Sequence, residues 1–397
     1  MEKQIKVLII PSWYPPNGGY FFREHAVALA AAGLRVDVLA GIHTSLKTLK
    51  PRSLINAFST TVSTFEGITE HTRKYWIIPF SDKLNFHAWV GMMTGFYQSY
   101  QKKEGHPDII LAHSSIWAGL VAAIISQRYG IPYIITEHRS RYVNNSTEAR
   151  KMFRPWHFNN LRTAFEGAAK VITVSDALQP FIKQISPKVA ARLATIPNMV
   201  DTGFFVPNYN HKQTKPFRIF SLSNLIPLKG MDTLVEAVAL LENQYPGEFR
   251  LTIGGEGPER LKLQKMVAKK KLHGVVTICG RLCREGILEN MQLANAFVLA
   301  SRFEAFGVVY IEAMACGLPV VGTRSGGPQH FIRESEGILT TPGNPQELAA
   351  ALKQLRATYH LFDQTKISRY AASKFGRAEV ASQYFTLFYE IVKKKQE

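Results

Sequence analysis

The sequence has little cysteine: its 397 residues include only Cys279, Cys283 and Cys316. Three thiols are too few for a disulfide framework, and the close pair Cys279 and Cys283 has no neighbouring His or further Cys to complete a zinc site. This usage disfavours a disulfide-stapled secreted domain. It favours a reducing, cytoplasmic setting.

Long hydrophobic runs are missing as well. The longest clean apolar run, Ala118–Ile125, is far shorter than the ~20 residues that a membrane-spanning helix needs. Near the amino terminus, Val7–Ile10 stops at Pro11 and is shorter than the ~7 to 15 residues of a signal-peptide core. We therefore expect a protein that crosses no membrane, while peripheral attachment to the inner face of one stays open.

Acidic residues are scarce relative to basic ones. Against 30 Asp and Glu stand 48 Lys and Arg, a formal net charge of +18. Such an excess indicates anionic partners, which include nucleic acid, anionic membranes and phosphorylated ligands. The only basic triplets, Lys269–Lys271 and Lys393–Lys395, lie in helix-like patterns without interleaved stacking aromatics. We therefore expect no nucleic-acid partner.

Short β-branched runs alternate with helical patterns along the whole chain. Continuous apolar strands of this kind are typical of a parallel sheet that is buried on both faces, so the sequence predicts a doubly wound α/β fold. The predicted strands are Val7–Ile10, Val36–Ala40, Ile109–Ala112, Tyr133–Thr136, Val171–Val174, Phe217–Leu222, Leu251–Ile253, Val275–Ile278, Phe297–Ala300 and Val320–Thr323.

The length exceeds the roughly 250 to 300 residues at which a single core stops growing, so we expect two domains. The polar stretch 208–216 breaks the periodicity between two strand–helix series of similar length. We place an N-terminal Rossmann-like domain at 1–207 and a C-terminal one at 208–378. The final helical pattern, 379–397, carries apolar residues and is expected to pack back on the first domain.

A pair of glutamates follows the predicted strand Phe297–Ala300. Glu304 lies in a short loop, a helix begins near Gly307, and Glu312 lies within that helix. The unpaired N–H groups at a helix amino terminus suit a phosphate. Carboxylates on either side can accept hydrogen bonds from sugar and ribose hydroxyls.

This spacing, E-x7-E within a strand–loop–helix, resembles the retaining GT-B glycosyltransferases of family four, or glycosyl transferases group 1. The resemblance implies two Rossmann-like domains facing across a cleft and transfer of a sugar from a nucleotide-sugar, UDP- or GDP-linked, with retention of configuration. It implies a glycan or lipid-linked acceptor in surface polysaccharide or lipopolysaccharide biosynthesis. Alongside Glu304 and Glu312, it implies donor contacts from the segment Ala305, Phe306, Gly307 and Val308.

Other donor-side residues follow from the same resemblance. Lys229 occupies the place of a lysine that neutralises the donor diphosphate, and Gly255 lies in a loop similar to the family's second glycine loop. Asn224 stands where the family usually has Arg, so one charged phosphate clamp is replaced by an uncharged hydrogen-bond donor. No D-x-D motif occurs, so the usual carboxylate pair for a divalent cation is missing, and we expect neither metal nor cofactor.

In the first half, Gly18 and Gly19 resemble the family's glycine loop, where the backbone approaches the leaving phosphate. His113 ends the strand Ile109–Ala112, is expected to point into the cleft and matches the family's active-site histidine. With Lys229 and Glu304 it completes the predicted catalytic set. Glu137 and His138 hold a similar position after the next strand without an assigned role, and Ser175 with Asp176 is interpreted as a helix cap.

A basic and aromatic segment follows His138. It predicts an acceptor-binding or membrane-facing surface that includes Arg139, Arg141 and Trp156. A helix with a solvated basic face and an aromatic core face is the alternative. The segment's cations are Arg139, Arg141, Arg150, Lys151, Arg154 and Arg162, its one acid is Glu148, and its apolar members include Tyr142, Met152, Phe153, Trp156 and Phe158.

Three rival functions share this fold. A nucleotide-sugar epimerase would need no acceptor, and an inactive sugar-nucleotide-binding partner of another transferase is suggested by Asn224. A nicotinamide oxidoreductase is disfavoured because no strand is followed by G-x-G-x-x-G with an acid about 20 residues on.

Overall fold

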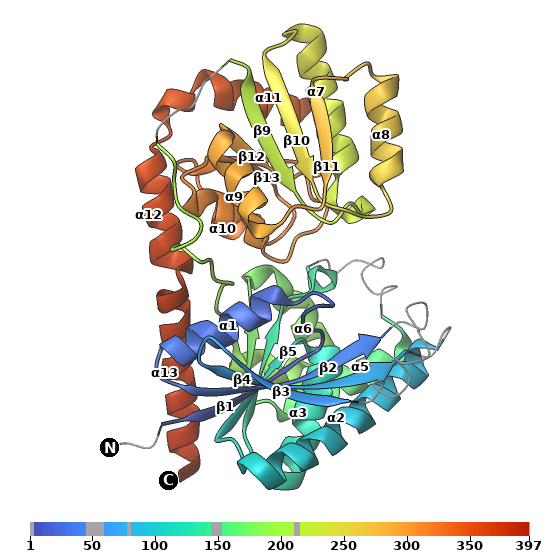
Figure 1. Ribbon diagram of the computed structural model, residues 1–397, viewed down its shortest axis with the longest axis vertical. Coiled ribbons are helices and arrows are strands. Elements are labelled where there is room, and N and C mark those ends of the chain that lie inside the picture. Colours follow the sequence, from blue (N-terminus) through green and yellow to red (C-terminus); the bar gives the residue numbers. More distant parts are fainter. Residues whose placement is uncertain (1–3, 45–58, 78–80, 144–152, 210–214, 397) are drawn as a thin grey trace.

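The computed structural model describes residues 4–44, 59–77, 81–143, 153–209 and 215–396. Two sheets divide the chain, as Figure 1 shows. The first has the order β3-β4-β2-β1-β5-β6-β7-β8, with every neighbour parallel except the β3–β4 pair. Its strands are β1 (Lys6–Pro11), β2 (Arg35–Thr44), β3 (Thr60–Phe65), β4 (Ile68–Trp76), β5 (Ile109–His113), β6 (Tyr133–Glu137), β7 (Lys170–Thr173) and β8 (Leu193–Thr195).

The second sheet is wholly parallel, in the order β11-β10-β9-β12-β13-β14. Its strands are β9 (Phe217–Leu222), β10 (Phe249–Gly254), β11 (Val276–Gly280), β12 (Ala296–Val298), β13 (Val320–Thr323) and β14 (Gly337–Thr340). All ten predicted strands are present, and the doubly wound α/β class is confirmed. Among the described residues four strands were missed: β3 because its residues are all exposed, β4 because many of its residues are polar and partly exposed, and β8 and β14 because they are short.

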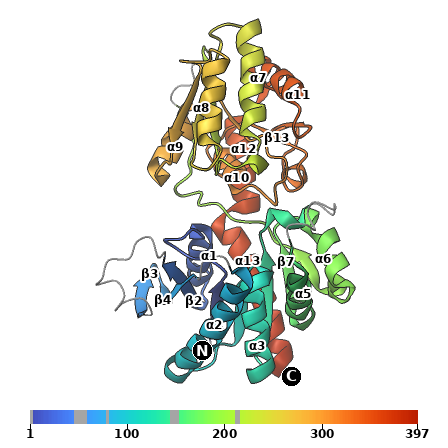
Figure 2. The same ribbon diagram turned by 90° about the vertical axis from the view of Figure 1, so that its right-hand side faces the viewer.

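Helices cover both sheets (Figures 1 and 2). Those of the first half are α1 (Tyr20–Ala31), α2 (Asp82–Glu104), α3 (Leu120–Tyr129), α5 (Pro155–Gly167) and α6 (Gln179–Ile185). Those of the second half are α7 (Met231–Gln244), α8 (Arg260–Lys269), α9 (Arg284–Leu293), α10 (Val308–Ala315), α11 (Pro345–Ala357), α12 (Gln364–Phe375) and α13 (Arg377–Gln396). Within the described ranges no helix is both long and apolar enough to span a bilayer.

The last helix returns to the first sheet. Helix α13 packs beside α1, and its fully buried Tyr384 and Phe388 belong to the same core cluster as the β1 side chains Val7 and Ile9. The linker between the two sheets runs from 196 to 216, of which residues 210–214 lie outside the described part.

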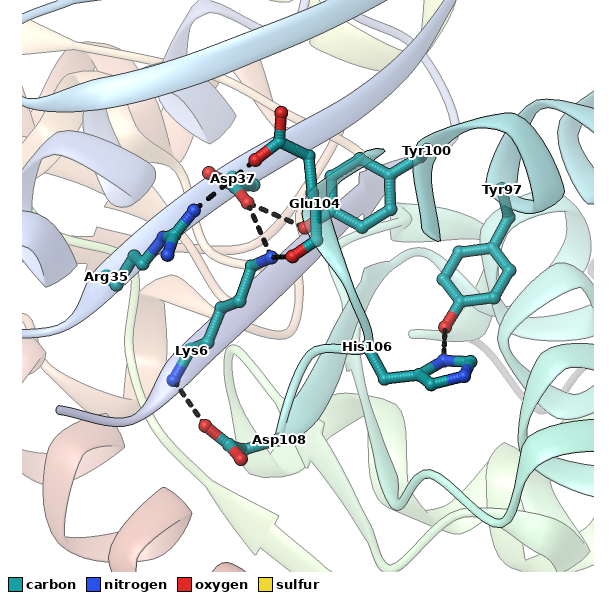
Figure 3. Close-up of polar contacts among 8 residues, drawn as sticks. All are labelled: Lys6, Arg35, Asp37, Tyr97, Tyr100, Glu104, His106 and Asp108. Carbon is teal, nitrogen blue, oxygen red and sulfur yellow. Dashed lines mark hydrogen bonds and ion pairs between the residues drawn. The ribbon is translucent and has the colours of Figure 1, made fainter. Parts of the chain in front are cut away.

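Strand β1 and its neighbours are closed at their amino ends by a polar network (Figure 3). Lys6 Nζ lies 3.5 Å from Asp37 Oδ2 and donates to the Glu104 carbonyl at 2.6 Å, while the Tyr100 hydroxyl donates to Asp37 at 2.6 Å. These groups satisfy one another, so this end of the sheet is structural. Chemistry is expected at the opposite, carboxyl end of the strands.

The carboxyl ends of the two sheets face each other. The Ser175 hydroxyl, just after β7, donates to the Ala305 carbonyl, which follows β12, at 2.5 Å. Gly326, after β13, lies so close to Val143 that a Cβ at position 326 would stand 2.3 Å from Val143 Cγ1. The loops that should carry the chemistry of each domain therefore touch across the interface.

Replacing Phe388 by Ala should destabilise the protein by about 3 to 5 kcal/mol, because a fully buried aromatic ring leaves a cavity between α13 and the first sheet. The neighbouring Tyr389, which is 43% exposed, is the matched control, and its change to Ala should cost less than about 0.5 kcal/mol. Denaturant unfolding measures both. Equal losses would show that α13 does not depend on its inward face.

Candidate active site

Lys229 and Glu304 form an ion pair between two loops of the second domain. Lys229 ends a short turn, Pro227–Lys229, after β9, and its Nζ lies 2.6 Å from Glu304 Oε2. The same carboxylate oxygen accepts a hydrogen bond from the Ser301 hydroxyl at 3.2 Å. Glu304 is 6% exposed, whereas Lys229 is only partly buried. Two of the three predicted catalytic side chains are therefore in contact, with the lysine on the accessible side.

The backbone around this pair is held on both sides. Glu304 N–H donates to the Ser325 carbonyl at 3.0 Å, and the Glu304 carbonyl accepts from Gly327 N–H at 2.8 Å. Arg302 N–H donates to the Leu228 carbonyl at 2.8 Å. The loops after β9, β12 and β13 are thus joined into one platform that positions the ion pair.

Helix α10 begins beside this platform. Gly307 precedes its first turn with a φ of 91°, a left-handed conformation that favours glycine. Ala305 and Phe306 are buried, and Phe306 packs on Phe331 with ring centroids 4.9 Å apart. Their side chains support the core, so only their backbone groups, with those of Gly307 and Val308, can meet a ligand at the helix amino terminus.

A cavity of about 600 Å³ lies between the two domains and is lined in part by Glu312. Burial, and secondarily Glu24 of α1, raises the pKa of Glu312 to about 8. Glu304 is not among the residues that line this cavity. Glu312 therefore faces the cavity, and Glu304 does not. The cavity walls are Tyr20, Arg23, Glu24, Val27, Phe65, Glu66, Asp201, Phe205, Arg281, Leu282, Cys283, Arg284, Ile287, Glu312 and Arg377.

Charged pairs close this cavity from both domains. The guanidinium of Arg284, at the start of α9, lies 2.8 Å from Asp201 and 3.4 Å from Glu24. Arg377, at the start of α13, contacts the same two carboxylates at 3.1 and 3.8 Å. Sequence reasoning missed this cluster because its members are far apart in the chain.

His113 is fully buried, so the expectation that it points into an open cleft is wrong for this structure. Its ring stacks on Phe22 at 4.4 Å, and its Nδ1 lies 3.0 Å from His138 Nε2. Burial lowers its pKa well below the ordinary value, so the ring is neutral. The Phe22 ring, carried by α1, is the physical reason for the enclosure.

The three predicted glycines occupy different settings. Gly19 precedes α1 with a φ of 75°, and a Cβ there would stand 2.6 Å from the Trp13 carbonyl oxygen, while Gly18 is less confined. At Gly255 a Cβ would meet the Ser223 carbonyl oxygen at 1.8 Å. Backbone packing alone therefore requires glycine at 19 and 255. Asn224 is exposed in the same β9 loop as Lys229.

Arg139 and Trp156, two of the predicted acceptor-side residues, lie in different parts of the first domain. The Arg139 guanidinium lies 4.9 Å from the Trp13 ring centroid, and its Nε donates to the Ser114 hydroxyl at 3.2 Å, which places it beside the glycine loop. Trp156 instead packs on Phe86 of α2, with ring centroids 4.8 Å apart. The Arg141 side chain and residues 144–152, which include Glu148, Arg150, Lys151 and Met152, lie outside the described part.

The aromatic members of that segment face inward. Tyr142 and Phe153 are buried, and Trp156 and Phe158 pack against the same core. Tyr142 and Phe153 are therefore core residues, while Trp156 and Phe158 are half-buried against that core. The burial of these rings fits the aromatic core face of the alternative, and the acceptor-binding or membrane-facing surface stays a prediction.

Ser175 was interpreted as a helix cap; it occupies the N-cap position of the short helix Asp176–Leu178, but the expected capping by its side chain is wrong. The side chain makes no cap bond; it bridges the two domains through the Ala305 carbonyl. Glu137 was left without a role, yet it is fully buried at the end of β6 and accepts several hydrogen bonds. Its position directly after a strand was the only signal in the sequence. Across the described residues, no three His, Cys, Asp or Glu side chains gather closely enough to hold a metal ion.

Two family models match adjacent parts of the chain. Residues 18–204 match the model described as Glycosyltransferase Family 4, and residues 205–372 match the model described as Glycosyl transferases group 1. The chain is a group 1 glycosyltransferase. The two models meet between Phe204 and Phe205, within the linker that joins the two sheets.

This glycosyltransferase is similar to the D-inositol 3-phosphate glycosyltransferase of Pseudarthrobacter chlorophenolicus, with 27% identity over 84% of this chain and 80% of that one. Among solved structures it resembles the sucrose-phosphate synthase of Thermosynechococcus elongatus, with a TM-score of 0.80, 22% identity and coverage of 98% and 100% of the two chains. Anabaena HepE in complex with UDP-glucose gives a TM-score of 0.72 at 19% identity, over 98% and 100%. These likenesses confirm the GT-B architecture.

The raised pKa of Glu312 predicts a pH dependence of stability. The unfolded chain releases this proton near the ordinary value of 4.5, whereas the folded enzyme keeps it up to about pH 8. The folded state then binds more protons in this window, so its stability falls as pH rises through it. Changing Glu312 to Gln removes that loss. Thermal unfolding of both proteins should show the variant gaining on the wild type from about pH 5 to 8; parallel curves would contradict the assignment.

Proposed function

We propose that this glycosyltransferase moves a sugar from a nucleotide-sugar donor to a glycan or lipid-linked acceptor, with retention of anomeric configuration and without a metal or cofactor. The Lys229–Glu304 pair beside the amino terminus of α10 carries this proposal. A cation, oriented N–H groups and a carboxylate within one platform suit a diphosphate with a sugar on one side and a nucleoside on the other.

The geometry suggests how the donor lies. The nucleoside occupies the cavity of about 600 Å³, where Glu312 meets the ribose hydroxyls. The diphosphate lies against Lys229 and the backbone of Gly307 and Val308. The sugar lies toward Glu304. Lys229 is partly exposed, so its ammonium can serve the phosphate while Glu304 keeps the Ser301 hydrogen bond.

Lys229 also fits the chemistry of bond cleavage. As the glycosidic bond breaks, negative charge grows on the leaving diphosphate, and a nearby ammonium stabilises that charge. We propose that the acceptor hydroxyl attacks from the face that the diphosphate leaves and that a phosphate oxygen takes the hydroxyl proton. His113 contacts the transferred sugar in this scheme, which requires the Phe22 ring to move off the imidazole.

The donor nucleotide is UDP or GDP in this proposal. Support for a nucleotide-sugar comes from HepE, whose structure was solved with UDP-glucose. Asn224 supplies an uncharged hydrogen-bond donor in place of the usual Arg. Lys229 must therefore neutralise more of the negative charge of the diphosphate.

For the acceptor we propose an anionic glycan or lipid-linked molecule in surface polysaccharide or lipopolysaccharide assembly, reached from the cytoplasmic side of a membrane. The net charge of +18 supports an anionic partner. Arg139, which lies beside the glycine loop, is the cation that we propose meets it.

The test is release of nucleoside diphosphate from UDP-, GDP- and ADP-sugars in buffer with a metal chelator. The wild type should hydrolyse one donor slowly, and Glu304→Ala should lower that rate at least about 100-fold because it removes a group that acts on the reacting sugar. Glu334→Ala, which changes an exposed acid of the same domain, is the control and should match the wild type.

Three outcomes would contradict the proposal. Release that persists in Glu304→Ala would move the chemistry away from the ion pair. No release and no thermal shift with any donor would favour an inactive partner, whereas a changed sugar configuration in the donor without an acceptor would favour an epimerase.

A further inference from the structure

Glu137 is a buried carboxylate that receives five hydrogen bonds. Its Oε1 accepts from the backbone N–H groups of His138 and Arg139, both at 2.9 Å, and from the Ser114 hydroxyl at 3.2 Å. Its Oε2 accepts from Ser115 N–H at 2.9 Å and from the Ser115 hydroxyl at 2.5 Å. The side chain is 0% exposed. Every one of these neighbours donates, which is the arrangement that an ionised carboxylate requires.

These bonds tie together two strand-end loops. Ser114 and Ser115 follow His113 at the end of β5, and His138 with Arg139 follows β6. Ser114 has a φ of 73°, a conformation that costs free energy in a non-glycine residue and persists only where the surroundings hold it. Its hydroxyl bond to Glu137 is part of what holds it.

The network extends toward the second domain. The Ser115 hydroxyl lies 2.7 Å from the hydroxyl of buried Tyr142. Tyr142 precedes Val143, the residue that lies against Gly326. One carboxylate thus connects the backbone that carries both histidines to the contact between the domains.

The histidines themselves form a directed chain. His138 Nδ1 lies 3.1 Å from Asn198 Oδ1, and with the amide in this orientation His138 carries its proton on Nδ1 and donates it to that oxygen. Its Nε2 is then an acceptor, and His113 Nδ1–H donates to it at 3.0 Å. Burial lowers the pKa of both rings, so each is neutral. This arrangement leaves His113 Nε2 as a bare acceptor, and that atom is buried without a partner among the described residues.

We infer that Glu137 is a positioning residue that holds His113 and His138 in this single arrangement and so keeps His113 Nε2 as the acceptor for the sugar contact already proposed. The inference rests on the proposed function for the identity of the sugar. The positioning itself rests on the five bonds to Glu137. A buried acceptor that lacks a partner is costly, and a sugar hydroxyl would satisfy it.

The test is Glu137→Gln, which turns one carboxylate oxygen into a donor facing other donors. We expect kcat to fall about 100-fold, the loss that a small misplacement of an active-site group can cause, while the donor KM stays within about threefold. Asp37→Asn is the matched control: Asp37 is also a buried carboxylate of the first sheet, but it lies at the amino end (Figure 3). It should lower stability and leave kcat unchanged.

A second readout does not depend on turnover. Nitrogen-15 NMR of the histidine rings should show His113 protonated on Nδ1 in the wild type and in Asp37→Asn, and a mixture of tautomers in Glu137→Gln. If the proposed function fails, this measurement still tests the positioning. Should Glu137→Gln not fold, Ser115→Ala removes one donor hydroxyl and should shift the same signals less. Unchanged His113 signals and unchanged kcat in the variants would overturn the inference, as would a wild-type His113 protonated on Nε2.

Discussion

Parallel strands bring all their carboxyl ends to one edge of a sheet, and in this enzyme the two sheets turn those edges toward each other. The Ser175–Ala305 hydrogen bond and the contact of Val143 with Gly326 fix that meeting. The proposed donor and acceptor sites depend on this contact between the sheets, because it brings together loops that are 130 residues apart in the sequence. The opposite, amino-terminal edge of the first sheet is closed by the Lys6–Asp37 network, whose polar groups satisfy one another, so this edge is structural.

Two buried carboxylates organise the two sides of this interface in different ways. Glu304 is paired with a cation that remains accessible, so its surroundings can change when an anionic ligand arrives. Glu137 is surrounded by five neutral donors, three backbone N–H groups and two hydroxyl groups, and a shift of any of them would leave a buried carboxylate oxygen less satisfied. The first suits binding and release. The second suits the fixed geometry that a reacting sugar needs.

The fold class and the ten buried strands were predictable because period and composition are local properties. Glu304 and Lys229 could be predicted from a motif, and the structure brings them together. Burial could not be predicted: His113 lies under Phe22, and Tyr142 and Phe153 face the core, because the packing partner of each ring comes from another part of the chain. The roles of Ser175 and Glu137 were missed for the same reason. A serine after a strand caps a helix in most settings, and only the tertiary arrangement shows that this one crosses between domains.

In the proposed binding mode, the nucleoside and the sugar of the donor lie on opposite sides of the α10 amino terminus. Calorimetric titration of UDP and GDP into metal-free protein tests it directly, with Glu312→Ala and Glu304→Ala compared with the wild type. Loss of ribose hydrogen bonds should weaken binding of the preferred nucleotide at least about tenfold in Glu312→Ala. Glu304→Ala should bind that nucleotide within about threefold of the wild type, since the ligand lacks the sugar that Glu304 faces. Equal affinities in wild type and Glu312→Ala would contradict the account.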